Sequence, residues 1–196
     1  MRQLIVYTHP NPKSFNHAIM ESLVSELTAN GEDVQVRNLY EIGFDPVLKG
    51  EDFVLIKSGS IAPDVAMEQG YIKWADIITF IYPVWWTGLP AMLKGYIDRV
   101  FSFGFAYTVD GGQAKGLLNG KKVFLISTTG GSSDMYNETG MLRSLNQTSD
   151  DGIFTFCSME VIGHKYFFAV PYISDADRQK MLDEIKTIAQ TIYVQK

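Results

Sequence analysis

Residues 76–101 read DIITFIYPVWWTGLPAMLKGYIDRVF, and this stretch sets the expected fold of the chain. Its first part, Asp76 to Tyr82, is a continuous apolar run typical of a central strand buried on both faces, and it ends at Pro83. Thr87 to Phe101 is predicted to be a helix, because apolar side chains recur along one side at spacings of three and four. A buried strand followed by an amphipathic helix is typical of a parallel sheet.

The same alternation of strands and helices continues on both sides of this stretch. Toward the N-terminus we predict a strand at Gln3–Thr8, a helix at Asn16–Ala29, an edge-like strand at Val34–Arg37, an irregular stretch with room for a short helix at Tyr40–Gly59, and a helix at Asp64–Trp74. Toward the C-terminus we predict strands at Lys122–Thr128 and Glu160–Ala169 and a final helix at Asp175–Tyr193. The expected fold is therefore α/β, a doubly wound parallel sheet with helices on both faces, in a single domain over residues 1–196.

The composition is that of an ordinary globular protein, and it argues against several functions. The formal net charge is -5 and no basic run occurs, which argues against binding to nucleic acid. The single cysteine, Cys157, cannot form an internal disulfide, and no paired Cys/His spacing indicates a metal site. No signal-peptide pattern follows Met1 and no apolar run reaches membrane-spanning length, so we expect a cytoplasmic protein.

Three unusual loops follow three of the long apolar strands. They are HPNPKSFN at residues 9–16, PVWWTGLP at 83–90 and TTGGSSDMY at 128–136. In an open α/β sheet, ligands bind outside the carboxyl ends of the strands. We therefore expect the three loops to gather around one ligand.

The first loop leads into the N-terminus of a helix, where unpaired N–H groups attract anions. Ser14, Asn16 and His9 add side-chain donors beside it. No G-x-G-x-x-G follows the first strand, so a monophosphate is favoured over a pyrophosphate. The alternative is that Ser14 only caps the helix and His9 has no role in binding.

The second and third loops offer contacts for a flat ring. Trp85 and Trp86 present aromatic surface, and stacking on such a surface contributes about 0.5–1.5 kcal/mol per contact beyond area burial. The backbone N–H groups of Trp85, Trp86 and Thr87 are expected to face heteroatoms of the ring. Thr128–Gly131 supplies hydroxyls, amides and close approach, and Tyr136 places a phenol at the ring edge. The alternatives are tryptophans that plug the end of the sheet, glycines of an ordinary turn and a surface tyrosine.

Together the three loops resemble the NAD(P)H:quinone oxidoreductase group of the flavodoxin-like superfamily, including its short bacterial members. The resemblance is carried by the first strand running into His9–Asn16, by Pro83–Tyr107 and by Thr128–Tyr136. The pattern P-A-x-L-K-G-x-x-D-R-V-F within the second segment is the most specific part. The resemblance implies a flavodoxin-like three-layer fold with a five-stranded parallel sheet in the order 2-1-3-4-5.

The resemblance also implies a flavin cofactor, FMN or alternatively FAD, with NADPH or NADH as the electron donor. The implied flavin-binding residues are His9, Ser14, Phe15 and Asn16 at the phosphate end, and Pro83, Val84, Trp85, Trp86, Thr87, Thr128, Thr129, Gly130 and Gly131 around the ring. Tyr136 is the candidate catalytic residue, because a donor near the N1 and O2 edge stabilises the charge that gathers there on reduction. Tyr107 and Trp86 are expected in the substrate pocket.

The implied activity is transfer of two electrons, as hydride through flavin N5, from NAD(P)H to a quinone-like acceptor with ping-pong kinetics. Two departures from the family pattern matter. Well-known members carry a histidine six residues after the tyrosine, and this chain has Leu142, so a Tyr–His pair is not supported; His164 is no substitute by spacing. The chain ends at Lys196, soon after the final predicted helix, which favours FMN over FAD.

Several alternatives remain within the same superfamily. One-electron carriers of the flavodoxin type are usually more acidic, and the aromatic stretch Phe101–Tyr107 is expected to cover a substrate pocket, which favours an enzyme. The acceptor is alternatively a nitro or azo compound. Some bacterial relatives are regulatory flavoprotein subunits of potassium efflux systems, so a membrane transporter is a possible partner. The resemblance further implies a homodimer.

Overall fold

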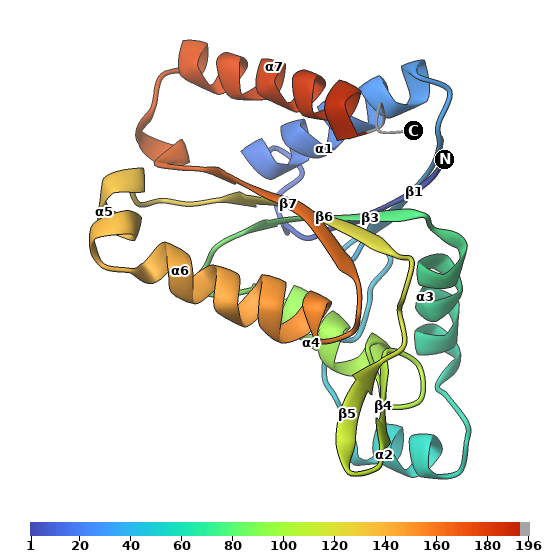
Figure 1. The fold of residues 1–196 in the computed structure, drawn as a ribbon. Helices are drawn as coiled ribbons and strands as arrows, with labels where there is room; N and C mark the ends of the chain where they lie inside the picture. Colours follow the sequence, from blue (N-terminus) through green and yellow to red (C-terminus); the bar gives the residue numbers. More distant parts are fainter. Residues whose placement is uncertain (193–196) are drawn as a thin grey trace.

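A five-stranded parallel sheet forms the centre of the computed structural model, which describes residues 1–192 (Figure 1). The sheet order is β2-β1-β3-β6-β7, and every neighbouring pair is parallel. The strands are β1 (Arg2–Tyr7), β2 (Asp33–Asn38), β3 (Ile77–Pro83), β6 (Lys122–Thr128) and β7 (Glu160–Phe167). Counted among the strands of this sheet, the order is 2-1-3-4-5, so the predicted flavodoxin-like fold is confirmed.

The burial of each strand follows its place in the sheet. β3 is buried at every residue and lies in the centre, as its continuous apolar run predicts. β2 alternates between exposed and half-buried residues along its first part and lies at the edge, as predicted. Pro83 is paired with Thr128, and the Thr8 N–H donates to the Ile81 carbonyl oxygen, so β1, β3 and β6 all end at one edge of the sheet.

Helices cover both faces of the sheet (Figure 1). On one face α1 (Phe15–Ala29) and α7 (Asp175–Ile192) lie side by side over a core that includes Ile5, Ile19 and Ile185. On the other face, a larger core joins the sheet to α3 (Pro63–Trp74), α4 (Ala91–Val100), α6 (Met141–Asn146) and the π-helix η1 (Gln147–Thr155). Within residues 1–192, no helix combines the length and apolar character needed to cross a membrane.

Most predicted elements are present within a few residues of their expected bounds, including the short α2 (Gly50–Lys57) inside the irregular stretch. Tyr193, the predicted end of the last helix, lies outside the described residues. The predicted helix at Thr87–Phe101 is wrong at its start, because α4 begins only at Ala91. Leu89 precedes a proline and is thereby disfavoured in helical conformation, and Pro90 forms the N-cap.

The segment between residues 107 and 155 contains structure that the sequence did not predict. A two-stranded hairpin of β4 (Tyr107–Asp110) and β5 (Gln113–Gly116) turns at Gly111 and Gly112, both with positive φ. Beyond β6, α5 (Ser133–Glu138) begins inside the predicted loop at 128–136, and α6 and η1 lie in the stretch before Glu160 for which we predicted no element. α5 and α6 have six residues each, too few to display a helical period or to be stable without tertiary packing.

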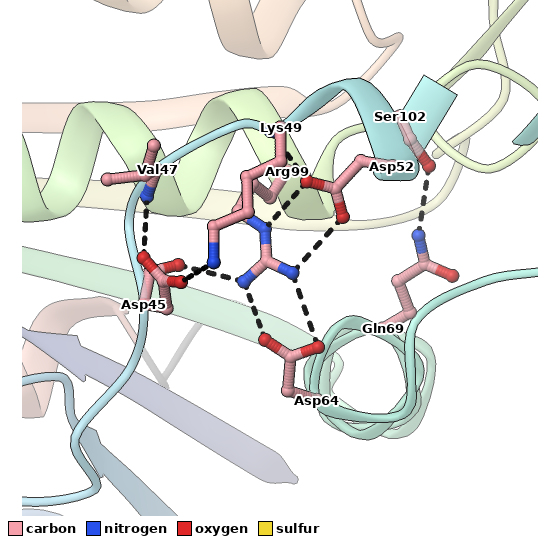
Figure 2. Close-up of polar contacts among 8 residues, drawn as sticks. All are labelled: Asp45, Val47, Lys49, Asp52, Asp64, Gln69, Arg99 and Ser102. Atoms are coloured by element: carbon pink, nitrogen blue, oxygen red, sulfur yellow. Dashed lines mark hydrogen bonds and ion pairs between the residues drawn. The ribbon is translucent and has the colours of Figure 1, made fainter. Parts of the chain in front are cut away.

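A buried guanidinium joins the helices on the larger core (Figure 2). The Arg99 side chain, on α4, donates to Asp52 Oδ1 of α2 at 3.1 Å, to Asp64 Oδ2 of α3 at 2.5 Å and to the Asp45 carbonyl oxygen at 2.8 Å. Arg99 is the arginine of the D-R-V-F pattern. Its fork-shaped cation, with several donors, matches acceptors from three segments at once.

The glycine of the same pattern, Gly95, allows a close contact between two segments. A Cβ on Gly95 of α4 would lie 2.0 Å from the Pro46 carbonyl oxygen, so only glycine lets the segment before α2 pack directly on α4. Together, Gly95 and Arg99 set the position of α4, whose N-terminal end follows the aromatic loop.

We expect Arg99→Met to lower the free energy of unfolding by about 3–5 kcal/mol, because it leaves the buried Asp52 carboxylate without its partner. Urea denaturation at pH 7 measures this. Lys94→Met is the matched control on the same helix: Lys94 pairs with Asp98 at the surface, so its loss costs about 0–1 kcal/mol.

The loss of unfolding free energy in Arg99→Met should also depend on pH. Burial alone would raise the pKa of Asp52, but hydrogen bonds from Arg99 and the Lys49 N–H outweigh it and hold that pKa below its ordinary value. A lowered pKa stabilises the fold above the unfolded value of about 3.9, and this stabilisation is lost as the pH falls through the folded pKa. The difference between wild type and Arg99→Met should therefore shrink below about pH 4; a constant difference would contradict the assignment.

Candidate functional site

One cavity of about 530 Å³ lies at the edge of the sheet where β1, β3 and β6 end, and it is called the first cavity below. Its volume falls in the range of roughly 300–1,000 Å³ usual for small-molecule sites. The first cavity is lined by His9, Ser14, Phe15, Asn16, Pro83, Val84, Trp85, Trp86, Thr128, Thr129, Gly130, Val170 and Pro171. All three predicted loops thus contribute to a single site.

The first loop places the positive end of α1 at the cavity. Ser14 is the N-cap residue, and its Oγ accepts a hydrogen bond from the His17 N–H at 3.2 Å. The N–H groups of Phe15 and Asn16 bond to no acceptor within residues 1–192. Ser14 therefore both caps the helix and lines the cavity, and two free N–H groups at the end of the helix dipole form a seat for an anion.

His9 adds a neutral donor to this seat. Its Nδ1 accepts a hydrogen bond from the Asn11 N–H at 3.0 Å, and burial lowers the pKa of the imidazole below its ordinary value. Both effects favour the neutral ring with its proton on Nε2. The ring packs edge-on against Trp85, with 5.7 Å between ring centroids.

The second loop is a strained two-residue turn. Trp85 and Gly88 exchange backbone hydrogen bonds of 3.2 and 3.1 Å, and the residues between them, Trp86 and Thr87, have φ values of 49° and 54°. Such turns favour asparagine and glycine, and each non-glycine residue held there costs about 1–3 kcal/mol. Strain of this kind concentrates at functional sites, and here it projects the Trp86 ring fully into solvent.

This turn corrects two sequence expectations. Trp85 and Trp86 are both exposed, so the alternative in which they plug the end of the sheet is wrong. The Trp85 N–H donates inside the turn and does not face a ligand. The N–H groups of Trp86 and Thr87 make no hydrogen bond in the part of the chain that the structure describes, so they alone are free to do so.

The third loop is connected to the first by a buried hydrogen bond. Asn16 Nδ2 donates to Thr128 Oγ1 at 2.8 Å, across a sequence separation of 112 residues. Asn16 Oδ1 is buried and has no partner among the described residues. A buried acceptor left unpaired costs about 1–3 kcal/mol. Asn16 lines the first cavity, so this unpaired acceptor belongs to a residue of its wall.

Three predicted flavin-binding residues do not line the first cavity. Thr87 lines a smaller neighbouring cavity instead. Gly131 lies under the Tyr136 ring, because a Cβ there would come within 2.9 Å of Tyr136 Cε2. Tyr136 itself is only 5% exposed, packs against Phe168, and is no surface tyrosine. Burial raises the pKa of its phenol, which therefore stays protonated at neutral pH.

Tyr107, predicted to lie in the substrate pocket, lies away from the first cavity at the start of the β4–β5 hairpin. Its ring packs against Phe103 at 5.8 Å and Phe156 at 5.5 Å between centroids. It lines neither of the two cavities described here.

Two residues of the first cavity, Val170 and Pro171, follow β7 and were not predicted from the sequence. The Ala169 N–H donates to the Gly131 carbonyl oxygen at 2.9 Å and the Val170 N–H to the Thr129 carbonyl oxygen at 3.0 Å. These bonds hold the turn after β7 against the third loop. A proline follows the last predicted strand, and that strand ends at the same edge of the sheet as β6. This position was the signal from which the two residues could have been predicted.

The chain matches the protein-family model described as flavodoxin-like fold over residues 1–189. A Haemophilus influenzae protein described as an uncharacterized NAD(P)H oxidoreductase is 39% identical over 184 residues, which cover 93% of this chain and 91% of the relative. Human ribosyldihydronicotinamide dehydrogenase (quinone) is 33% identical over 210 residues, covering 97% of this chain and 91% of the human protein.

Among solved structures, the NAD(P)H:quinone oxidoreductase from Methanothermobacter marburgensis superposes with a TM-score of 0.89. It is 25% identical in sequence, and the match covers 98% of each chain. The similarity therefore extends over nearly the whole chain, the three loops included.

We expect Gly131→Ala to lower the free energy of unfolding by about 1–2 kcal/mol, because its Cβ would displace the Met135 and Tyr136 side chains. Gly130→Ala is the matched control, since nothing lies within 4 Å of its Cβ. Urea denaturation of both variants measures the difference. Equal stabilities would show that the third loop does not hold Tyr136 in this way.

Proposed function

The chain belongs to the flavodoxin-like fold family and to its NAD(P)H:quinone oxidoreductase group, and on that basis we propose that it binds FMN in the first cavity and passes two electrons from NADPH or NADH to a quinone-like acceptor. One observation carries the proposal: an anion seat at the end of α1 and an exposed aromatic turn lie in one cavity. A phosphate-tailed flat ring needs both features at once.

The donors at the α1 end suit a single phosphate. Phe15 and Asn16 supply free N–H groups, Ser14 a hydroxyl and His9 a neutral Nε2–H. One helix N-terminus and no glycine-rich pyrophosphate loop favour FMN over FAD. The unpaired Asn16 Oδ1 suits a cofactor whose phosphate and ring are joined by a hydroxyl-bearing chain.

The ring end is provided by the second and third loops. Trp85 and Trp86 offer aromatic surface, the Trp86 N–H remains free as a donor, and Gly130 allows close approach. When bound, the flavin supplies the hydride chemistry, taking two electrons from the nicotinamide and giving them to the acceptor in separate half-reactions.

Tyr136 lies directly behind Gly131, the residue after Gly130 of the cavity wall, and serves as a hydrogen-bond donor to the charge that builds up on the reduced ring. Its phenol is held protonated by burial, and its hydroxyl bonds to no other group among the described residues. The position of the family histidine is held by Leu142, which packs on the larger core. Tyr136 therefore acts alone by electrostatic stabilisation and not as part of a proton relay.

We expect the purified protein to take up one FMN per chain at micromolar concentration. NADPH or NADH added without oxygen should bleach the flavin absorption, and a quinone should restore it. Absorption spectroscopy measures both half-reactions. Failure to bind FMN and FAD alike in correctly folded protein would contradict the proposal.

The variant for this experiment is Tyr136→Phe, which removes only the hydroxyl. It should leave FMN affinity nearly unchanged and slow flavin reduction by roughly 10²-fold, the usual cost of losing one donor to developing negative charge. Tyr71→Phe, a hydroxyl deletion on α3 outside the first cavity, is the control and should reduce its flavin at the wild-type rate.

We also propose that the protein acts as a homodimer in which Tyr107 serves the site of the partner copy. Tyr107 lines neither cavity of its own chain, and its two aromatic neighbours, Phe103 and Phe156, are 49% and 44% exposed. Clustered exposed aromatic side chains mark interaction surfaces.

We expect a dimer by size-exclusion chromatography with light scattering, and a monomer for Phe156→Glu, because a charge would be buried at the contact. Val54→Glu on α2 is the control, since Val54 is 67% exposed and outside this cluster. A wild-type monomer with full quinone reductase activity would contradict the proposal.

A further inference from the structure

A second cavity of about 280 Å³ lies next to the first, on the face of the sheet covered by α4, α6 and η1. The two cavities share Val84, and the second is also bounded by the strained turn at Thr87. Its walls combine apolar side chains such as Leu145 and Ile153 with the hydroxyl groups of Thr148, Ser149 and Tyr166. The one cation at its wall, Lys94, is paired with Asp98.

The hydroxyl groups of this wall have already donated their protons. Thr148 Oγ1 donates to the Ser144 carbonyl oxygen at 3.0 Å, and the Tyr166 hydroxyl donates to Asn146 Oδ1 at 2.8 Å. Ser149 Oγ lies 2.6 Å from Asp150 Oδ1 and 2.8 Å from the Leu145 carbonyl oxygen, and its single proton goes to one of them. Each of these three oxygens keeps lone pairs, so this side of the cavity accepts hydrogen bonds, while Thr87 and Lys94 place donors elsewhere on its wall.

A buried array of polar side chains behind the wall fixes the direction in which these hydroxyl groups donate. His164 Nδ1 lies 2.9 Å from Asp150 Oδ1, and His164 Nε2 lies 2.8 Å from Ser127 Oγ. A carboxylate is a stronger acceptor than a neutral carbonyl, so Asp150 favours the orientation in which Ser149 donates to it. The His164 ring also stacks on Tyr166 at 3.9 Å between centroids, which fixes that side of the cavity. Tyr82 also lines the second cavity, and burial raises the pKa of its phenol.

The order Ser127, His164, Asp150 has the geometry of a hydrolase triad, but the surroundings exclude that role. Ser127 is 0% exposed and lines neither cavity, so no substrate carbonyl reaches its Oγ. Its neighbour Thr128 points to the opposite face of the sheet and lines the first cavity. The array therefore orients side chains in the wall of the second cavity and has no nucleophilic role.

The π-helix η1 explains how the wall and the array are formed together. Ser149 and Ile153 both face the second cavity, while Asp150 is directed to His164. Gly152 allows the wide turn, because a Cβ there would lie 3.0 Å from the Gln147 carbonyl oxygen. π-Helices are rare and are frequent at functional sites.

We propose that the second cavity binds a neutral one- or two-ring hydroxyaromatic molecule, whose ring contacts Leu145 and Ile153 and whose hydroxyl donates to Ser149. A quinone has only acceptors and so makes no hydrogen bond to the oxygens of Thr148, Ser149 and Tyr166. The reduced product of a quinone acceptor belongs to the class that does match, and only this identification of the natural ligand rests on the proposed function. Binding of the class itself rests on the cavity alone.

The test is calorimetric titration with 2-naphthol and with 2-methoxynaphthalene, which has the same ring system but no proton to donate. Each is titrated into protein saturated with FMN and into protein without added FMN. We expect 2-naphthol to bind about tenfold more tightly than the ether, the effect of one neutral hydrogen bond. Ser149→Ala should remove this preference.

Ile153→Phe, which fills the cavity from η1, should weaken the binding of both probes at least about tenfold, whereas Ile153→Val should bind both as the wild type does. Circular dichroism melting confirms that each variant is folded.

Equal affinity for the two probes in wild type, no binding of either, or unchanged binding in Ile153→Phe would each overturn the assignment. Selective 2-naphthol binding in a protein that takes up no flavin would support the ligand class proposed for the second cavity and contradict only the proposed flavin function.

Discussion

Parallel pairing of β1, β3 and β6 is the constraint on which the rest of this structure depends. Because the strands run in one direction and in register, their carboxyl ends meet at one edge, and the loops that follow them share one cavity. None of these loops is a site by itself. The anion seat of the first lacks a ring surface, and the aromatic turn of the second lacks the helix N-terminus that attracts a phosphate.

That edge is held by contacts that reach across the fold. The Asn16–Thr128 hydrogen bond joins the first loop to the third, and the backbone bonds of Ala169 and Val170 add the turn after β7. On the opposite face, Arg99 and Gly95 fix α4, whose N-terminal end follows the strained Trp86–Thr87 turn. Rigid support of this kind is what allows non-glycine residues to keep positive φ values.

Alternation along the strands divides polar residues between two cavities. Thr128 contributes to the first cavity, while Ser127, one residue before it, joins His164 and Asp150 behind the second. Tyr82 in β3 and Val84 just after it likewise belong to the core on the α4 side of the sheet. Two adjacent cavities of different chemistry, one with a helix N-terminus and exposed tryptophans and one with apolar and hydroxyl side chains, therefore arise from one sheet edge, with Val84 and the aromatic turn between them.

The sequence by itself determined the sheet, its order and the three loops, because buried strands and amphipathic helices have periods that are visible locally, and because Pro83–Tyr107 carries a specific family pattern. Only the tertiary structure decided the start of α4, the short helices after β6, the use of the Trp85 N–H within the turn, the burial of Tyr136 behind Gly131, and the place of Tyr107 among aromatic side chains of the hairpin. It also placed His164, which spacing did not relate to any site, against Asp150 and Ser127. These features depend on contacts between residues far apart in the chain, and local pattern does not record such contacts.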